Sequence, residues 1–136
     1  MTINATTAGK EDMKNVIEDA KKYKEEFGKK SILFVDGIHR FNKAQQDFLL
    51  PFVEKDNIIL IGATTENPFF EVNNALISRS IIFQLKQITP DDIIESLMKA
   101  ISDKENGLGN LNLMVDNEAM LFLANLSNGD IRYAHP

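Results

Sequence analysis

The sequence predicts an α/β domain with a mainly parallel sheet, followed by a helical part. Three short, continuous apolar runs, at residues 31–36, 58–63 and 80–85, are typical of strands buried on both faces of a parallel sheet. Helical patterns precede and separate these runs, and alternating strands and helices indicate an α/β fold. Beyond the third run only helical patterns remain. We therefore expect two domains, at residues 1–87 and 88–136.

Two main helices are predicted in the first domain. Residues 10–27 carry apolar side chains three or four positions apart, with acidic residues in the first turn and Gly28 where the helix should end. Residues 42–54 also follow helical spacing. The side chains expected to face inward from this second helix are Ala44, Phe48, Leu49 and Phe52.

The second domain begins with a clear helix start. Thr89 is placed as a cap, Pro90 occupies the first helical position, and an acid follows three residues after the cap. Residues 103–114, rich in Gly and Asn, are expected to form a loop. Asp116 is placed to cap another helix, and Asp130 one more. The side chains expected to face inward are Ile93, Ile94, Leu97, Met98 and Ile101 from the first helix, and Met120, Leu123 and Leu126 from the second.

Composition is that of an ordinary globular protein. Of the 136 residues, 43% are hydrophobic and 26% are charged, and no apolar run approaches the ~20 residues of a membrane helix. No signal peptide is visible at the N-terminus, and we expect no membrane partner. The absence of cysteine excludes disulfides and suits a reducing cytoplasm. A net charge of −5 gives no overall attraction to nucleic acid.

Asp36 is the first candidate for chemistry, because it ends an apolar strand. Ligands of open α/β sheets bind beyond the carboxyl ends of the strands, and one carboxylate there suits Mg²⁺ held through water. Two alternatives stay open. The Asp36-Gly37 pair also fits a hairpin turn, and Asp36 followed by Lys86 after a later strand fits a phosphoacceptor domain loosely.

Three further residues have both a chemical and an ordinary interpretation. Thr65, with Thr64, follows the next strand and could sense a phosphate, although Thr also punctuates ordinary loops. Arg79 could reach the phosphates of a neighbouring subunit, or simply be solvated. Arg132 lies in the first turn of the helix beginning at Asp130, where a bound anion would stabilise it. Asp130 could equally neutralise that arginine.

Taken together, these segments resemble one group of AAA+ ATPases. The run ILFVDGIHRFNKAQQD at residues 32–47 resembles its Walker B segment, and GATTENP at 62–68 its sensor 1 segment. The runs ALISRS at 75–80 and GDIR at 129–132 resemble its arginine-finger and sensor 2 segments. The group is the replication-associated recombination protein A family, also called MgsA and, in eukaryotes, Werner helicase-interacting ATPase.

The resemblance implies a role for each candidate residue. Asp36 would hold Mg²⁺, Thr65 would act as sensor 1, Arg79 as a finger on a neighbour's ATP, and Arg132 as sensor 2. It implies a partial AAA+ P-loop core at 1–87 and the start of a helical lid at 88–136. It also implies a homo-oligomer in the cytoplasm, associated with the nucleoid. That oligomer would act on single-stranded or fork-junction DNA near single-strand-binding protein.

The sequence departs from the family at two points that matter for chemistry. No Gly-x-x-x-x-Gly-Lys-[Ser/Thr] loop occurs, so the cradle for the β- and γ-phosphates is missing. Gly37 stands where the family has the Glu that polarises the attacking water. We therefore expect no ATP hydrolysis by this chain alone. A non-catalytic, clamp-loader-like interaction subunit is the main alternative, with a receiver-like domain a remote one.

The missing loop also affects the expected sheet. In the AAA+ fold, the strand before the phosphate loop lies between the strands expected here at 58–63 and 80–85. Its absence would leave two unpaired strand edges. We expect the chain either to close this gap by moving a strand or to pair with another chain.

Overall fold

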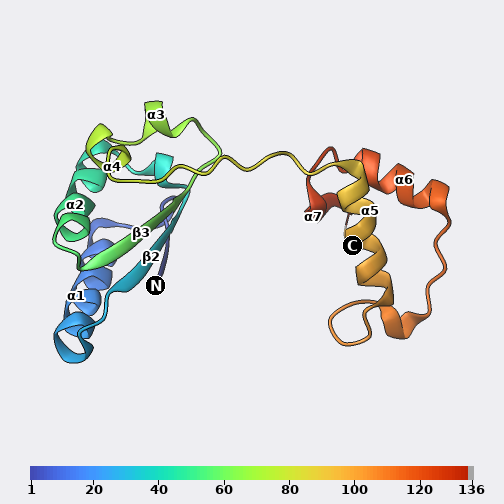
Figure 1. Ribbon diagram of the computed structural model, residues 1–136, viewed down its shortest axis with the longest axis horizontal. Coiled ribbons are helices and arrows are strands. Elements are labelled where there is room, and N and C mark those ends of the chain that lie inside the picture. Colours follow the sequence, from blue (N-terminus) through green and yellow to red (C-terminus); the bar gives the residue numbers. More distant parts are fainter. Residues whose placement is uncertain (135–136) are drawn as a thin grey trace. The chain divides into compact units, whose positions relative to one another are not determined.

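The computed structural model describes residues 1–134. The chain forms two compact units, Met1–Ile82 and Phe83–Pro136 (Figure 1). Each unit has a hydrophobic core of its own. Within residues 1–134, no helix combines the length and the apolar character needed to cross a membrane.

The first unit is built on a three-stranded parallel sheet. Its order is β1 (Thr2–Asn4), β2 (Ser31–Asp36) and β3 (Ile58–Ala63), so β2 lies in the centre. The two six-residue strands confirm the predictions from the apolar runs. Strand β1 was missed, because three residues with a single buried side chain, Ile3, carry too short a pattern to recognise.

Helix α1 (Lys10–Phe27) confirms the first predicted helix. It ends at Gly28, whose left-handed backbone (φ 65°) lets its N–H donate to the Lys24 carbonyl at 2.8 Å. The buried stripe of α1 packs on one face of the sheet, and Figure 1 shows α1 and α2 on that side. The core side chains on this face include Met13, Ile17, Ala20, Leu33 and Val35.

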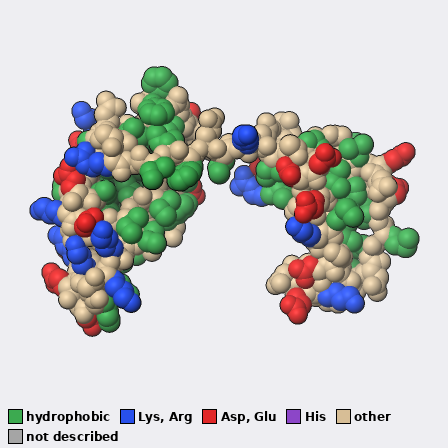
Figure 2. Space-filling view, viewed as in Figure 1, with side chains coloured by type: hydrophobic (Ala, Val, Ile, Leu, Met, Phe, Trp, Pro, Cys, Tyr) green, Lys and Arg blue, Asp and Glu red, His purple; other side chains and the backbone are tan. Residues whose placement is uncertain are grey.

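Only one face of the sheet is covered, which corrects the expectation of strands buried on both faces. Leu33 and Val35 of β2 are fully buried, whereas the alternating residue Ile32 is exposed, as are Ile59 and Ile61 of β3. Successive side chains of a strand point to opposite faces, so these three isoleucines share the open face. Figure 2 shows hydrophobic side chains at the surface of this unit.

Helix α2 (Lys43–Glu54) confirms the second predicted helix but not its inward face. Asn42 and Gln45 form a reciprocal cap, each accepting the other's backbone N–H at 2.8–2.9 Å. Leu49 is buried as expected and Phe48 and Phe52 are half-buried, whereas Ala44 is exposed. The predicted inward face did not include Gln46. This residue is buried, and its side-chain amide is satisfied by hydrogen bonds to the protein.

The strand predicted at residues 80–85 is wrong. After β3, the chain forms two short helices, α3 (Pro68–Glu71) and α4 (Asn74–Ile77), and residues 80–88 belong to no helix or strand. A strand needs a hydrogen-bonded neighbour, and in the described part of the chain no strand lies beside this run. The expected gap inside the sheet is therefore replaced by a free outer edge on β3.

The second unit is helical, as predicted. It contains α5 (Pro90–Ser102), a 3₁₀ turn η2 (Gly109–Leu111), α6 (Asn117–Leu126) and a short α7 (Ile131–Ala134). The Thr89 and Asp116 caps form as expected. Two inward assignments are wrong, because Met98 and Leu126 are exposed. The core of this unit consists of Ile93, Leu97, Met120, Ala124 and Ala134.

Candidate functional site

Asp36 ends the central strand of the sheet. Its Cα lies in register with Asn4 of β1 and Ala63 of β3, and both pairings are parallel. A hairpin turn at Asp36 is therefore wrong, since a hairpin would produce an antiparallel neighbour. The Asp36 side chain is exposed and makes no hydrogen bond or ion pair with any described residue. The carboxylate is thus free at the carboxyl edge of the sheet.

Gly37 turns the chain away from the strand. Its backbone is left-handed (φ 70°, ψ 43°) and leads into a 3₁₀ turn, η1 (Ile38–Arg40). A Cβ built on Gly37 would meet nothing closer than the Arg40 Cγ at 3.7 Å. The backbone conformation, rather than lack of space, therefore favours glycine here.

Thr64 and Thr65 follow β3 at the same edge and have different surroundings. The Thr64 hydroxyl oxygen lies 2.8 Å from His39 Nδ1 and also accepts the Glu66 N–H at 3.0 Å. Thr65 is exposed, and its side chain has no hydrogen-bond partner within residues 1–134. The hydroxyl left free is therefore that of Thr65.

His39 has a positioning contact that the sequence analysis missed. Its ring joins the segment after β2 to the segment after β3 through Thr64. No spacing rule marks such a pair, because the two residues stand 25 positions apart and meet only through the strand register. The contact ties together the loops that carry Asp36 and Thr65.

Gln46 links α2 to the turn between α3 and α4. Its amide nitrogen donates to the carbonyls of Phe41 at 3.1 Å and Glu71 at 3.0 Å, and its amide oxygen accepts the Asn73 N–H at 2.7 Å. Asn73 in turn donates from its side chain to Asp47 at 2.6 Å. These bonds fix the segment that leads to Arg79.

Arg79 is held on its own unit. Its guanidinium lies 2.7 Å from Glu54 Oε1, at the last residue of α2, and donates to the Ala75 carbonyl at 2.9 Å. Both partners of the ion pair are about half exposed. No hydrogen bond or ion pair in the described chain joins Arg79 to Asp36 or Thr65, so the structure does not bring the third candidate to the other two.

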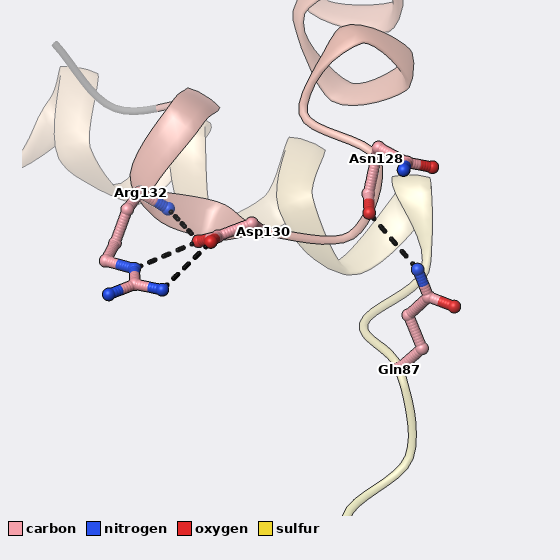
Figure 3. Close-up of polar contacts among 4 residues, drawn as sticks. All are labelled: Gln87, Asn128, Asp130 and Arg132. Atoms are coloured by element: carbon pink, nitrogen blue, oxygen red, sulfur yellow. Dashed lines mark hydrogen bonds and ion pairs between the residues drawn. The ribbon is translucent and has the colours of Figure 1, made fainter. Parts of the chain in front are cut away.

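Arg132 belongs to the second unit and is paired with Asp130 (Figure 3). The Arg132 Nε and Nη2 lie 3.2 and 3.0 Å from the two carboxylate oxygens of Asp130, and the Arg132 backbone N–H also donates to this carboxylate. These hydrogen bonds lower the pKa of Asp130 and raise that of Arg132. The neutralising role that the sequence left open for Asp130 is therefore realised.

The turn before this pair has its own anchor. Gln87 donates from its amide to the Asn128 carbonyl at 3.1 Å (Figure 3). Gly129 adopts a left-handed backbone (φ 81°), and a Cβ there would lie 2.5 Å from the Gln87 amide nitrogen. A side chain at position 129 would therefore displace Gln87 as well as strain the backbone.

Comparison with known proteins agrees with this arrangement. A profile of the family described as "ATPase family associated with various cellular activities (AAA)" matches residues 2–90. The chain is 44% identical over 132 residues to replication-associated recombination protein A of Escherichia coli, covering 97% of this chain and 29% of the relative. It is 46% identical over 132 residues to the ATPase WRNIP1 of Dictyostelium discoideum, of which it covers 15%.

The fold also matches solved structures. The RuvB Holliday junction branch migration motor of Thermotoga maritima superposes with a TM-score of 0.69 at 24% identity, covering 98% of this chain and 42% of that one. This likeness concerns the fold alone. The chain spans 29% of the length of the Escherichia coli relative and 15% of that of the Dictyostelium discoideum relative. From the matched profile over the sheet unit and its strand-end residues, the chain belongs to the AAA family of ATPases.

Proposed function

We propose that this chain supplies the metal-binding and phosphate-sensing edge of an ATPase that remodels DNA at stalled replication forks. The observation that carries the proposal is the parallel register of β2 and β3, which brings Asp36 and the Thr64-Thr65 pair to one edge of one sheet. Ligands of open α/β sheets bind at this edge. The similarity to proteins named for replication-associated recombination supports the cellular setting.

Asp36 is the proposed ligand of Mg²⁺. Mg²⁺ in nucleotide sites keeps several waters and is held by one or two carboxylates together with the substrate phosphates. A single exposed carboxylate without a protein partner fits that requirement. Within residues 1–134 no cluster of three potential metal ligands occurs, so the phosphates and waters would complete the coordination. When bound, the ion neutralises charge on the phosphates.

Thr65 is the proposed sensor of the terminal phosphate. Its hydroxyl is exposed and free to donate, whereas that of Thr64 is engaged by His39 and Glu66. The His39–Thr64 contact restrains the loop after β3 relative to the loop after β2. That restraint would keep Thr65 beside Asp36 while a phosphate binds, so the sensor needs little reorganisation.

Arg79 and Arg132 are proposed to contact ATP from outside the sheet edge that carries Asp36 and Thr65. Arg79 follows α4 and is held by Glu54 at the end of α2 and by the Ala75 carbonyl, away from Asp36 and Thr65 of its own chain. We infer that it acts as a finger on the ATP of a neighbouring copy in a homo-oligomer. Arg132, at the start of α7, would act as sensor 2 from the second unit. In that assignment residues 1–87 are part of the AAA+ core and residues 88–136 begin the lid.

The proposed partners are DNA and the proteins that accompany it. Single-stranded DNA or fork junctions are the expected substrates, with single-strand-binding protein nearby, in the cytoplasm at the nucleoid. The net charge of −5 argues against affinity spread over the whole surface. Attraction to DNA would therefore depend on the complete assembly.

Hydrolysis needs groups that this sequence does not contain. The phosphate loop is missing, and Gly37 has no side chain to polarise water. We therefore expect no turnover by the chain itself. Gly37 also favours a second function, that of a non-catalytic clamp-loader-like subunit that keeps Arg79 for a neighbour's ATP.

To test this proposal, a nucleotide-binding segment that contains a Gly-x-x-x-x-Gly-Lys-Thr loop is fused in front of Met1; the product is called the joined chain. We expect this joined chain to bind a fluorescent ATP analogue with Mg²⁺ and to turn over slowly. Asp36→Asn should weaken Mg²⁺-dependent binding by about tenfold or more. Asp19→Asn, which removes an exposed charge from α1, is the matched control and should change nothing. Equal affinity of the Asp36 and Asp19 variants would refute the metal role.

A second variant separates the enzyme from the interaction subunit. Gly37→Glu in the joined chain restores the acid expected to polarise water but places a Cβ on a left-handed backbone. In Gly37→Glu protein that circular dichroism shows to be folded, turnover should rise while the binding affinity stays similar. Rapid hydrolysis with Gly37 still in place would contradict the role given to that missing Glu. No gain from Gly37→Glu would favour the clamp-loader-like function.

A further inference from the structure

Gln87 lies where the chain enters the second unit. It stands four residues after Phe83, where this unit begins, and two residues before Thr89, the cap of α5. Its side-chain amide nitrogen donates to the Asn128 carbonyl at 3.1 Å, although the two residues are 41 positions apart (Figure 3). One side chain therefore joins the entry segment of this unit to the turn that follows α6.

The turn that Gln87 reaches has a left-handed backbone at two successive residues. Asn128 has a φ of 49° and Gly129 a φ of 81°, and the Asp130 N–H closes the turn by donating to the Ser127 carbonyl at 3.0 Å. Ser127 is buried and its hydroxyl donates back into α6, which fixes the start of the turn. The middle of the turn is held by Gln87, whose Cγ would lie 2.8 Å from a Cβ built on Gly129. A hydrogen bond and close packing thus place the turn against the entry segment.

The same turn carries the group that holds Arg132. Asp130 ends the turn, and its carboxylate accepts hydrogen bonds from the Arg132 backbone N–H and from two guanidinium nitrogens (Figure 3). Within residues 1–134 the guanidinium hydrogen bonds to no other residue, and the Arg132 side chain is 87% exposed. The position of the guanidinium therefore follows from the backbone of the turn and of α7, rather than from packing of its own side chain.

We propose that Gln87 is a positioning residue for Arg132 and acts through the turn at residues 127–130. The inference rests on the sensor 2 role proposed above for this arginine. Donors that are already aimed at a phosphate stabilise its charge without the cost of reorganisation. Without the Gln87 bond, the turn would keep its links to α6 and α7 but lose its restraint against the entry segment. Part of its ordering would then accompany phosphate binding and lower the affinity.

The first test needs no nucleotide. Gln87→Met keeps the length of the side chain but has no donor, so the Asp130 and Arg132 amide protons should exchange with water about threefold faster or more, as measured by NMR. Gln87→Lys, which restores a donor on a long side chain, should bring slow exchange back. Asn110→Leu is the matched control, because it removes a bond of the same kind, from a side-chain amide to the Lys104 carbonyl at 2.8 Å, elsewhere in this unit. It should leave the two amides as they are. Unchanged exchange in Gln87→Met, or equal acceleration in Asn110→Leu, would overturn the proposal.

The second test measures the binding of a fluorescent ATP analogue to the joined chain. Gln87→Met should weaken binding by about three- to tenfold, whereas Asn110→Leu should not change it. Gln87→Met combined with Arg132→Ala should bind like Arg132→Ala alone, because Gln87 acts through the arginine.

The failure of this inference differs from that of the sensor 2 assignment. If Arg132→Ala weakens binding and Gln87→Met does not, Gln87 is no positioning residue and sensor 2 stands. A further loss on adding Gln87→Met to Arg132→Ala would also overturn the proposal, since Gln87 would then act without the arginine. If Arg132→Ala itself leaves the affinity unchanged, the sensor 2 role is wrong, and amide exchange alone then decides whether Gln87 holds the turn.

Discussion

Gln46 of α2 and Asn73, the residue before α4, are joined by a 2.7 Å hydrogen bond from the Asn73 N–H to the Gln46 amide oxygen. Gln46 is 2% exposed and also donates to the backbone carbonyls of Phe41 and Glu71, so its side chain makes three hydrogen bonds to the protein while almost fully buried. Through this side chain, the helix that follows Asp36 sets the position of the turn that carries Arg79. The Gln46 side-chain amide therefore connects the helix after Asp36 to the segment that leads to Arg79.

Removing that amide should be costly. Gln46→Ala leaves the Asn73 N–H and the carbonyls of Phe41 and Glu71 without their partner. An unsatisfied buried polar group costs about 1–3 kcal/mol, so we expect a loss of roughly 2 kcal/mol or more in the free energy of unfolding. Urea denaturation followed by circular dichroism measures it. Gln84→Ala, at an exposed glutamine, is the control, and equal losses in the two variants would contradict the structural role.

Arg79 should matter for turnover far more than for stability. Its ion pair with Glu54 is half exposed, so Arg79→Ala should change the free energy of unfolding by less than about 1 kcal/mol. In the joined chain with Gly37→Glu, the same substitution should slow ATP hydrolysis by about a thousandfold if the arginine acts as a finger.

Arg79→Lys provides the comparison for this prediction. Lysine can keep the ion pair with Glu54 but lacks the planar fork that suits phosphate. We therefore expect normal stability and slow hydrolysis. Normal hydrolysis in the alanine variant would rule out the finger role.

The elements that the sequence predicted well are those with local signals. Helix α1, the Thr89 and Asp116 caps, and strands β2 and β3 each carry their own spacing or capping residues. The strand predicted at 80–85 failed because a strand depends on a neighbour, and an apolar run does not say whether one exists. Strand β1 was missed for the opposite reason. Its short sequence carries no strand pattern of its own, and it forms a strand because β2 lies beside it.

The candidate site was predicted in part for the same reason. The sequence indicates Asp36 at a strand end, and the fold confirms that position. The His39–Thr64 and Gln46–Asn73 contacts join residues 25 and 27 positions apart. Such pairs arise from tertiary packing, and no periodicity within one element marks them. The paired state of Arg79 likewise depends on where α2 ends relative to α4.

Gly37 should resist replacement because of its backbone. A left-handed conformation costs a residue with a Cβ roughly 1–2 kcal/mol, so Gly37→Ala should lose about 1 kcal/mol of unfolding free energy. Gly28→Ala should lose a similar amount, because Gly28 is also left-handed and has open space around it. Gly37→Asn should lose less, since Asn tolerates this region. Thermal or urea unfolding of the three variants tests the order, and a neutral Gly37→Ala would contradict the conformation.

The cap of α5 should weaken as the pH falls. Hydrogen bonds from the Thr89 hydroxyl and backbone N–H lower the pKa of Asp92 below 3.8. Since the folded pKa is the lower one, the cap contributes stability above about pH 3.8, and this contribution is lost as the pH falls through the folded pKa. An NMR titration of the Asp92 carboxyl measures the value. In Thr89→Ala the pKa should move back up, and an unchanged pKa would contradict the contact.

Asp130 should compete with any anion for Arg132. The guanidinium is 87% exposed and bound through two nitrogens to the Asp130 carboxylate, so a phosphate that engages Arg132 must replace those contacts. Asp130→Asn removes the negative charge but keeps an amide oxygen able to accept the Arg132 N–H, since Asn caps helices as well as Asp does. Helix α7 should therefore persist.

The two substitutions at this pair should act in opposite directions on nucleotide affinity. In the joined chain, Asp130→Asn should tighten ATP binding, because Arg132 no longer has a competing carboxylate, and Arg132→Ala should weaken it. Combining both should match Arg132→Ala alone, since the aspartate acts only through the arginine. Titration with a fluorescent ATP analogue measures all three. If Asp130→Asn tightened binding equally in the absence of Arg132, the gain would come from reduced negative charge alone, and Arg132 would not contact the phosphate.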